Sequence, residues 1–100
     1  MTTPWGRSQA IEKVGEGIQF VSTASHGGYV LDAERNAKIP YAWRKASFNE
    51  NGLRGFYEED CDWTMVALTF PEYFSQFTGA LEEATKLLKH FYPNLLTKPQ

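Results

Sequence analysis

The sequence has few residues of the kinds that build disulfides, metal centres or membrane spans. It contains one cysteine and two histidines in 100 residues, so no disulfide can close within the chain and no zinc quartet of Cys and His can form. No apolar run approaches the roughly 18 residues of a transmembrane helix, and no signal-peptide pattern opens the chain. We therefore expect a cytoplasmic protein with no cofactor, no metal site and no membrane contact.

Basic residues are too few for a general nucleic-acid-binding surface. Ten Lys and Arg stand against twelve Asp and Glu, which gives a net charge of −2. Neutralising phosphates requires a face on which Lys and Arg dominate. The composition therefore predicts no direct, general binding to nucleic acid.

Aromatic residues, in contrast, are abundant enough to supply a core. Phe, Trp and Tyr make up 15% of the chain, and each buried ring removes roughly 150–250 Å² from water. A chain of this length fits one domain rather than two. We expect a single domain over residues 1–100, ordered over about 5–93, which folds without metal as a monomer or weak homodimer.

The first third of the chain has the pattern of an antiparallel meander. Residues 10–14, 18–23 and 29–31 are rich in β-formers, and turn sequences at 15–17 and 25–28 separate them. Glycine in these turns adopts positive φ at little cost. The sequence predicts three short strands joined by tight turns.

Helix signals follow the strands. Asp32 is placed to cap a short helix over 33–37, which ends before Pro40. Residues 41–45 fit a further helical turn, and 49–52 has the composition of a loop. The middle of the chain is therefore expected to be helical but irregular.

A longer amphipathic helix is predicted near the C-terminus. Pro71 suits the first position of a short element that continues over 72–77. Thr78 is placed to cap a helix over 79–91, one face of which is apolar. The residues expected on this buried face are Leu81, Ala84, Leu88 and Phe91.

Between these regions, an acidic run at 58–62 precedes an apolar stretch at 63–70. We expect one helix whose first turn carries the carboxylates, because the N-terminus of a helix bears partial positive charge. A buried strand over 63–70 is the alternative, since Trp, Thr, Val and Phe also tolerate β structure. The predicted fold class is α+β, with a short antiparallel meander followed by three to four helices.

The acidic run has three interpretations. Carboxylates could bind Mg²⁺ or Ca²⁺, but consecutive helical residues point about 100° apart and do not converge on one ion without help. The run could instead complement the helix dipole, which requires no function. As a recognition surface, it would contact a basic partner.

Charge is distributed unevenly along the chain. Residues 35–54 hold five Lys or Arg against one Glu, a local charge of +4, whereas 58–62 carry four carboxylates. These two blocks either pair with each other inside the fold or leave the molecule with an acidic face and a basic face.

The His26-Gly27-Gly28 segment is similar to the glycine-rich oxyanion loop of esterases. That loop works beside a G-x-S-x-G nucleophile elbow, which this sequence lacks. A hairpin turn is the simpler interpretation, with a binding or catalytic role as the alternative.

Cys61 is the one thiol available as a nucleophile, with His26 and a carboxylate as partners. The flanking Asp60 and Asp62 raise a thiol pKa, which opposes that role. On a helix, Cys61 would join an apolar stripe with Met65 and become a small core residue. We expect a buried, inert cysteine.

A group of aromatic residues lies among the charges in the middle of the chain. Its members are Tyr41, Trp43, Phe48, Phe56 and Tyr57. Mixtures of aromatic residues and arginine are typical of protein interfaces. The alternative is that these rings close the core beneath a long loop.

Several motifs together carry a family resemblance. They are Trp5-Gly6, the stretch 21–28, the stretch 34–37 before Ile39-Pro40, the stretch 57–63 and the stretch 67–71. Over roughly residues 4–93 the chain resembles a small uncharacterised domain family encoded in phages, plasmids and integrated elements of proteobacteria. Phe56 stands where that family has a tryptophan.

The resemblance implies a biological setting for the protein but identifies no catalytic residue. Similar domains occur with anti-restriction modules, which implies a protein that acts in the cytoplasm of a host bacterium against its defences, including an anti-CRISPR or anti-restriction role. The expected partner is a host defence protein or nuclease complex. The expected binding residues are Tyr57, Glu58, Glu59, Asp60, Asp62, His26 and Trp43.

The sequence is therefore compatible with two functions from different classes. The first is a non-enzymatic inhibitor that binds a defence protein through a shape-specific interface. The second is a small enzyme or metal-dependent domain that uses His26, Asp60 and Cys61, and it requires these three residues to meet in one cleft.

Overall fold

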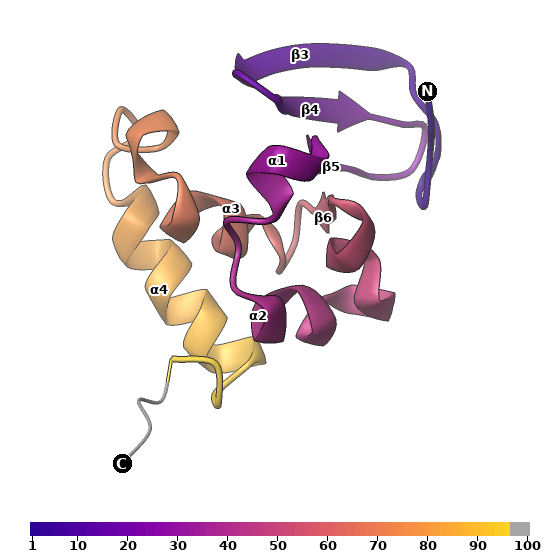
Figure 1. Cartoon of the computed structure of the whole chain (residues 1–100). Helices are drawn as coiled ribbons and strands as arrows, with labels where there is room; N and C mark the ends of the chain where they lie inside the picture. Colours follow the sequence, from indigo (N-terminus) through magenta and orange to yellow (C-terminus); the bar gives the residue numbers. More distant parts are fainter. Residues whose placement is uncertain (97–100) are drawn as a thin grey trace.

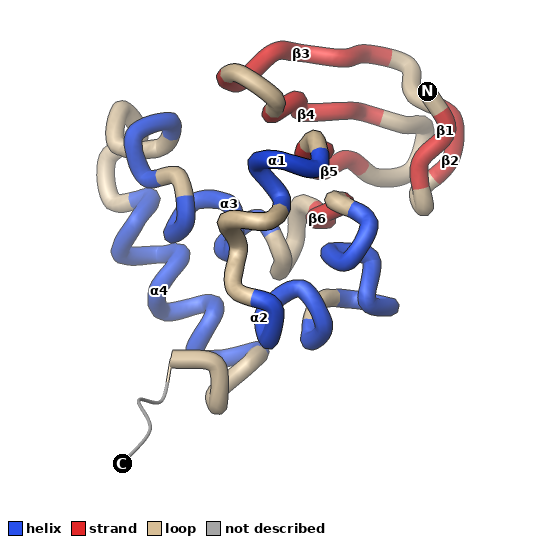
Figure 2. Tube along the Cα trace, viewed as in Figure 1, coloured by secondary structure: helices blue, strands red, loops and turns tan. Residues whose placement is uncertain are grey.

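The structure, a computed structural model that describes residues 1–96, is built around a four-stranded antiparallel sheet (Figures 1 and 2). Its strands follow the chain order across the sheet, namely β3 (Ala10–Gly15), β4 (Ile18–Ser22), β5 (Gly27–Leu31) and β6 (Phe56–Glu58). The predicted meander is confirmed by the first three strands. The fourth strand was not predicted.

Helical elements make up most of the described chain after β5 and place the domain in the predicted α+β class. They are α1 (Ala33–Asn36), α2 (Tyr41–Ala46), the 3₁₀ segment η1 (Phe48–Arg54), α3 (Trp63–Thr69), the 3₁₀ segment η2 (Pro71–Tyr73) and α4 (Ala80–Phe91). In Figure 1, α4 lies on the side of the molecule opposite the N-terminal residues. The Asp32 cap of α1 is confirmed, because its carboxylate accepts a hydrogen bond from the Arg35 N–H at 2.8 Å.

The prediction of one helix that begins within the acidic run was wrong. Tyr57 belongs to β6, where it pairs with Tyr29, and the helix begins only at Trp63. Burial explains the difference, because the Tyr57 ring is 0% exposed. Its hydroxyl donates to the side-chain oxygen of Asn36 and lies 3.2 Å from the Gly52 carbonyl. Burial of this tyrosine ring, with contacts to two other elements, stabilises the strand. This effect outweighs the preference of the acidic residues for the first turn of a helix.

The apolar stretch that follows is a helix, as predicted, and not a strand. Met65, Val66 and Ala67 in α3 are completely buried. They form one core cluster with inner-face residues of the sheet and with Ala84 and Leu88 of α4. This cluster holds the sheet and the two helices together.

Two details of the last helix differ from the prediction. Thr78 does not cap it, since Gly79 occupies the N-cap in a left-handed conformation with φ of 76°. Phe91 is not on the buried face, as 46% of its surface is exposed. The chain packs further than expected, because Leu95 and Leu96 contact the core.

A small N-terminal hairpin, also not predicted, covers part of the outer face of the sheet. It consists of β1 (Thr2–Thr3) and β2 (Gly6–Arg7). The Thr23 hydroxyl, just after β4, donates to the His26 carbonyl at 2.6 Å and lies 3.2 Å from the Trp5 carbonyl. The Trp5 ring also packs edge-to-face on Phe56, with centroids 6.0 Å apart. Trp5 is thereby placed above β5.

Glycine is required at position 28 because of this packing. A Cβ there would lie 2.4 Å from the Tyr57 carbonyl oxygen and 2.5 Å from the Trp5 ring. The absence of a side chain at Gly28 therefore allows the β6 backbone and the Trp5 indole to approach β5 closely. Gly27 and Gly28 lie in β5 itself rather than in the turn.

We expect Gly28→Ala to lower the free energy of unfolding by about 1–3 kcal/mol, as overpacking does in a filled site. Chemical denaturation measures the loss, and Trp fluorescence reports whether the Trp5 ring is displaced. Ala24→Ser adds one heavy atom in the exposed turn nearby and should stay within about 0.5 kcal/mol of wild type. Equal stability of the two variants would contradict the packing described for Trp5.

Candidate functional site

The turn between β6 and α3, residues 58–62, is organised by the side chain of Glu58. One carboxylate oxygen accepts from the backbone N–H of Cys61 at 2.5 Å and of Asp62 at 2.7 Å. The other oxygen accepts from the N–H of Asp60 at 2.9 Å. Three amides ahead of α3 are thus satisfied by one side chain, as a capping residue would do. Glu58 is therefore a structural residue of this acidic turn.

Asp62 is buried and links three segments. Its side chain is 0% exposed and accepts from the Phe48 N–H at 2.8 Å and from the Tyr92 hydroxyl at 2.6 Å. Burial raises the pKa of this carboxyl, and the hydrogen bonds from Tyr92 and Phe48 oppose the rise. Asp62 thus joins the starts of η1 and α3 to the end of α4.

The other two acidic residues of the turn, Glu59 and Asp60, face the surface. Both side chains are exposed, and neither forms an ion pair within residues 1–96. Arg44 donates instead to the Ile39 carbonyl, and Arg54 donates to the Asn51 side chain. The acidic and basic blocks of the sequence therefore do not pair in the described part of the chain.

The structure buries some of the predicted binding residues and leaves others at the surface. Tyr57 and Asp62 are completely buried, so they cannot touch a partner in this conformation. Trp43 is half-buried and packs against the core cluster. His26 is exposed in the turn before β5, where its backbone N–H is held by the Thr23 hydroxyl at 3.1 Å.

A cavity of about 260 Å³ opens beside the acidic turn. Segments from both halves of the chain form its walls, and the lining residues are Trp5, His26, Phe48, Glu58, Asp60, Cys61 and Tyr92. We call this the turn cavity. Three of the segments singled out in the sequence, around Trp5, around His26 and at 58–62, thus converge on one place.

Aromatic surface dominates the turn cavity. The rings of Trp5, Phe48 and Tyr92 line it, and Phe48 is 59% exposed. The two residues after Phe48 have left-handed backbone, with φ of 52° at Asn49 and 55° at Glu50. This conformation is unfavourable for residues other than glycine, and such strain is concentrated at functional sites. The Phe48 backbone itself is fixed by its N–H, which donates to the Asp62 carboxylate at 2.8 Å.

Cys61 and His26 both line the turn cavity with Asp60, as the enzyme hypothesis requires. Burial, followed by the charges of the nearby carboxylates, raises the pKa of the Cys61 thiol to about 11. No hydrogen bond joins the His26 imidazole to Cys61 or Asp60. Contrary to the prediction, Cys61 precedes α3 and is only half-buried.

The described residues contain no cluster of side chains suited to bind a metal ion. Within residues 1–96, no group of three or more His, Cys, Asp or Glu side chains is placed to hold an ion. The carboxylate of Glu58 is occupied by backbone amides, and that of Asp62 by Phe48 and Tyr92.

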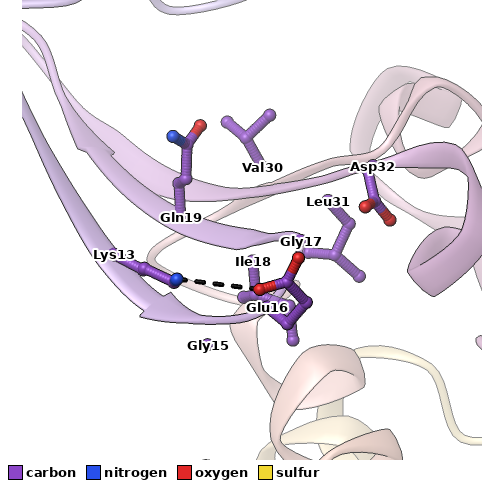
Figure 3. Close-up of a pocket in the computed structure, with 9 residues that line it drawn as sticks. All are labelled: Lys13, Gly15, Glu16, Gly17, Ile18, Gln19, Val30, Leu31 and Asp32. Carbon is purple, nitrogen blue, oxygen red and sulfur yellow. Dashed lines mark ion pairs between the residues drawn. The ribbon is translucent and has the colours of Figure 1, made fainter.

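A larger hollow of about 470 Å³ lies at the β3–β4 turn and is drawn in Figure 3. Lys13, Gln19 and Val30 are successive register partners across β3, β4 and β5, and Lys13 also forms an ion pair with Glu16 at the turn (Figure 3). That pair spans 3.7 Å between side chains that are each 73% exposed, so it contributes little. The hollow gathers no converging set of polar groups and is a weaker candidate than the turn cavity.

Sequence reasoning missed the two ends of the chain as parts of the site. Trp5 appeared there only within a family motif, and Tyr92 is simply the residue that follows the helix predicted over 79–91. An aromatic next to glycine at the N-terminus, and a tyrosine just before Pro93, are weak signals by themselves. Phe48 was included in the aromatic group, but nothing in the sequence separated it from the core aromatics.

One family model matches the chain over residues 1–98, a domain of unknown function named DUF7007. The chain therefore belongs to this family. No curated protein and no solved structure matches it. None of the helices in residues 1–96 has the length and apolar character needed to cross a bilayer.

We expect Asp62→Ala to leave the Phe48 N–H and the Tyr92 hydroxyl unpaired, at roughly 1–3 kcal/mol for each buried donor. Asp62→Asn retains an acceptor for Phe48 and should lose far less. Because burial raises its pKa, Asp62 contributes most stability when protonated, and that contribution is lost as pH rises through its folded pKa.

Chemical denaturation of wild type and both variants at several pH values measures the loss of stability in each variant and its dependence on pH. Wild type should lose stability relative to Asp62→Asn as pH rises. Asp60→Asn changes an exposed carboxylate two residues away and serves as the control. Similar losses for the alanine and asparagine variants of Asp62 would rule out the role assigned to its hydrogen bonds.

We expect alkylation of Cys61 by iodoacetamide at pH 8 to run about tenfold slower than that of a free thiol of pKa 9.0. A rise to about 11 lowers the thiolate fraction about 100-fold, and the greater nucleophilicity of a more basic thiolate recovers about tenfold of the rate. The rate should increase with pH towards 11. Asp60→Asn should increase it at pH 8, whereas Glu83→Gln on α4 should not. Alkylation at the rate of a free thiol would contradict the raised pKa.

Proposed function

We propose that this domain is a non-enzymatic protein-binding module whose contact surface is the turn cavity together with the exposed carboxylates of Glu59 and Asp60. The observation that carries this proposal is the convergence of three distant chain segments on one aromatic-walled cavity. Side chains at such a distance in sequence meet only in the complete fold.

The chemistry of the turn cavity favours a basic side chain as its occupant. Three aromatic rings offer faces to a cation, and Asp60 offers a carboxylate without an internal partner in residues 1–96. An arginine of a partner protein satisfies both, because its guanidinium stacks on rings and bonds carboxylates. We infer a basic segment of the partner protein at this surface.

The size of the cavity supports an anchoring side chain rather than a metabolite. Its volume of about 260 Å³ is below the roughly 300–1,000 Å³ of small-molecule sites. Interfaces concentrate their binding energy in a few aromatic and arginine anchors placed in such pockets. The strained segment at Asn49 and Glu50, which presents Phe48, fits a preformed contact.

The biological target that we propose is a bacterial defence protein, with the domain acting as an anti-CRISPR or anti-restriction inhibitor encoded by a phage or other mobile element. This part rests on the motif resemblance described above and on the chemistry of the surface. A restriction or CRISPR nuclease presents basic surfaces to nucleic acid, and the exposed acidic residues of this domain complement such a surface.

A small enzyme or metal-dependent domain remains the second candidate, and one observation favours it. His26, Asp60 and Cys61 line the same cavity. The raised pKa of Cys61 opposes its use as a nucleophile. Cys61→Ser separates the two candidates, because binding should survive this change and thiol catalysis should not.

We expect Asp60→Lys and Phe48→Ala each to weaken binding of the partner at least about tenfold, since both remove groups at the proposed contact. Both side chains are exposed, so stability should change by less than about 0.5 kcal/mol. Partners are captured from a host lysate and identified by mass, and affinity is then measured at two salt concentrations. Charge reversal at Asp60 should also flatten the salt dependence of association.

Matched controls lie on other parts of the molecule. Glu83→Lys reverses an exposed charge on α4, and Phe77→Ala truncates a ring that is 57% exposed but does not line the turn cavity. Phage plating on a host with an active defence system tests inhibition directly. Equal loss in the control variants, or full activity of Asp60→Lys and Phe48→Ala, would refute the assignment of this surface.

A further inference from the structure

The other end of η1 carries a second cavity with the opposite charge. It measures about 280 Å³, and its lining residues are Leu31, Ala33, Asn36, Ala37, Arg44, Leu53 and Arg54. We call it the arginine cavity. Its two guanidinium groups come from α2 and from the last residue of η1.

Both arginines are held in place by contacts that leave most of their donors free. Arg44 donates through Nε to the Ile39 carbonyl at 3.0 Å, and its guanidinium lies 5.6 Å from the centre of the Tyr41 ring. Arg54 donates to the Asn51 side chain at 2.9 Å and lies 5.6 Å from the centre of the Phe56 ring. Stacking on rings fixes the guanidinium planes without using their N–H groups.

Neither charge is neutralised inside the described chain. The carboxylates that form ion pairs in residues 1–96 bond to Lys13, Arg35 and Lys45 and not to Arg44 or Arg54. A guanidinium has five N–H donors, and each of these two uses one on a protein acceptor. Two arginines that line one cavity and lack a carboxylate partner in residues 1–96 supply the N–H donors that an oxyanion binds.

We propose that the arginine cavity binds the carboxylate of an acidic side chain on a partner protein. The apolar part of its lining, from Leu31, Ala33 and Leu53, suits the methylene groups of Glu or Asp. The net charge of −2 opposes a long phosphate polymer at this surface. A cavity below the size of small-molecule sites accepts one side chain.

This site does not depend on the function proposed for the turn cavity. It lies at the other end of η1, has the opposite charge and can be tested without a host partner. A partner that engaged both sites would meet a cation-binding pocket and an anion-binding pocket on the two ends of one segment.

The test is an NMR titration of the full chain that follows the Nε–Hε signals of its arginines. Sodium acetate and sodium phosphate are the two probes, added at constant ionic strength. We expect saturable shifts of the Arg44 and Arg54 signals with acetate. Arg54→Gln should weaken acetate binding about tenfold, since it removes a charge-assisted pair of hydrogen bonds.

Control variants separate geometry from charge. Arg54→Lys retains the charge without the planar fork and should fall between wild type and Arg54→Gln. Arg7→Gln removes an exposed arginine on β2 and should bind acetate as wild type does. Arg44→Gln is secondary, because Arg44 also supports the Ile39 carbonyl.

Three results would overturn the proposal. The first is a linear response of the arginine signals without saturation, which indicates screening alone. The second is unchanged binding in Arg54→Gln. The third is phosphate binding at least tenfold tighter than acetate at the same arginines, which would assign the cavity to a phosphate group instead.

Discussion

The buried carboxylate of Asp62 is the contact on which most of the arrangement depends. It accepts from the Phe48 amide and the Tyr92 hydroxyl, so one residue fixes η1 and the end of α4 relative to the start of α3. Glu58 prepares this contact from the other side, because its carboxylate accepts the amides of the turn that delivers Asp62 to the interior. Two acidic residues are therefore structural, and that leaves Glu59 and Asp60 as the surface charges. The four carboxylates of the run look alike in sequence and have two different roles in the fold.

Local patterns were sufficient for the elements whose signals are local. Alternation of β-formers with glycine turns located β3, β4 and β5, and the side chain of Asp32 marked the start of α1. β6 could not be found in this way, because it has only three residues and exists through its pairing with β5. The N-terminal hairpin is equally short, and its position depends on a contact between Trp5 and residues far along the chain. Burial of Tyr57 between distant partners is a property of the assembled core, which no window of sequence displays.

The kinds of residue in the candidate site could be predicted from the sequence, but the individual residues that line it could not. The sequence pointed to the acidic run, to His26 and to an aromatic group, and the structure brings Asp60, His26 and Phe48 to one cavity. It also removes Tyr57 and Asp62 from the surface, because both side chains lie in the interior, with hydrogen bonds to Asn36 and to Tyr92 respectively. The basic block of the sequence likewise divides, since Arg35 and Lys45 have carboxylate partners while Arg44 and Arg54 do not. Charge counts along a chain cannot report such pairing, because it depends on which side chains the fold brings within contact.

The walls of the turn cavity include Trp5 from one end of the described chain and Tyr92 from the other. During synthesis Trp5 leaves the ribosome well before Tyr92, and domains fold as units once their sequence has emerged. A nascent chain can thus form the β3–β5 meander early, yet it cannot complete the cavity until the end of α4 is free. The same holds for a fragment cut ahead of Tyr92, which would retain every acidic residue of the turn but lack both a cavity wall and the hydroxyl that binds Asp62. Recognition through this cavity would therefore require the whole stretch from Trp5 to Tyr92 to be present and folded.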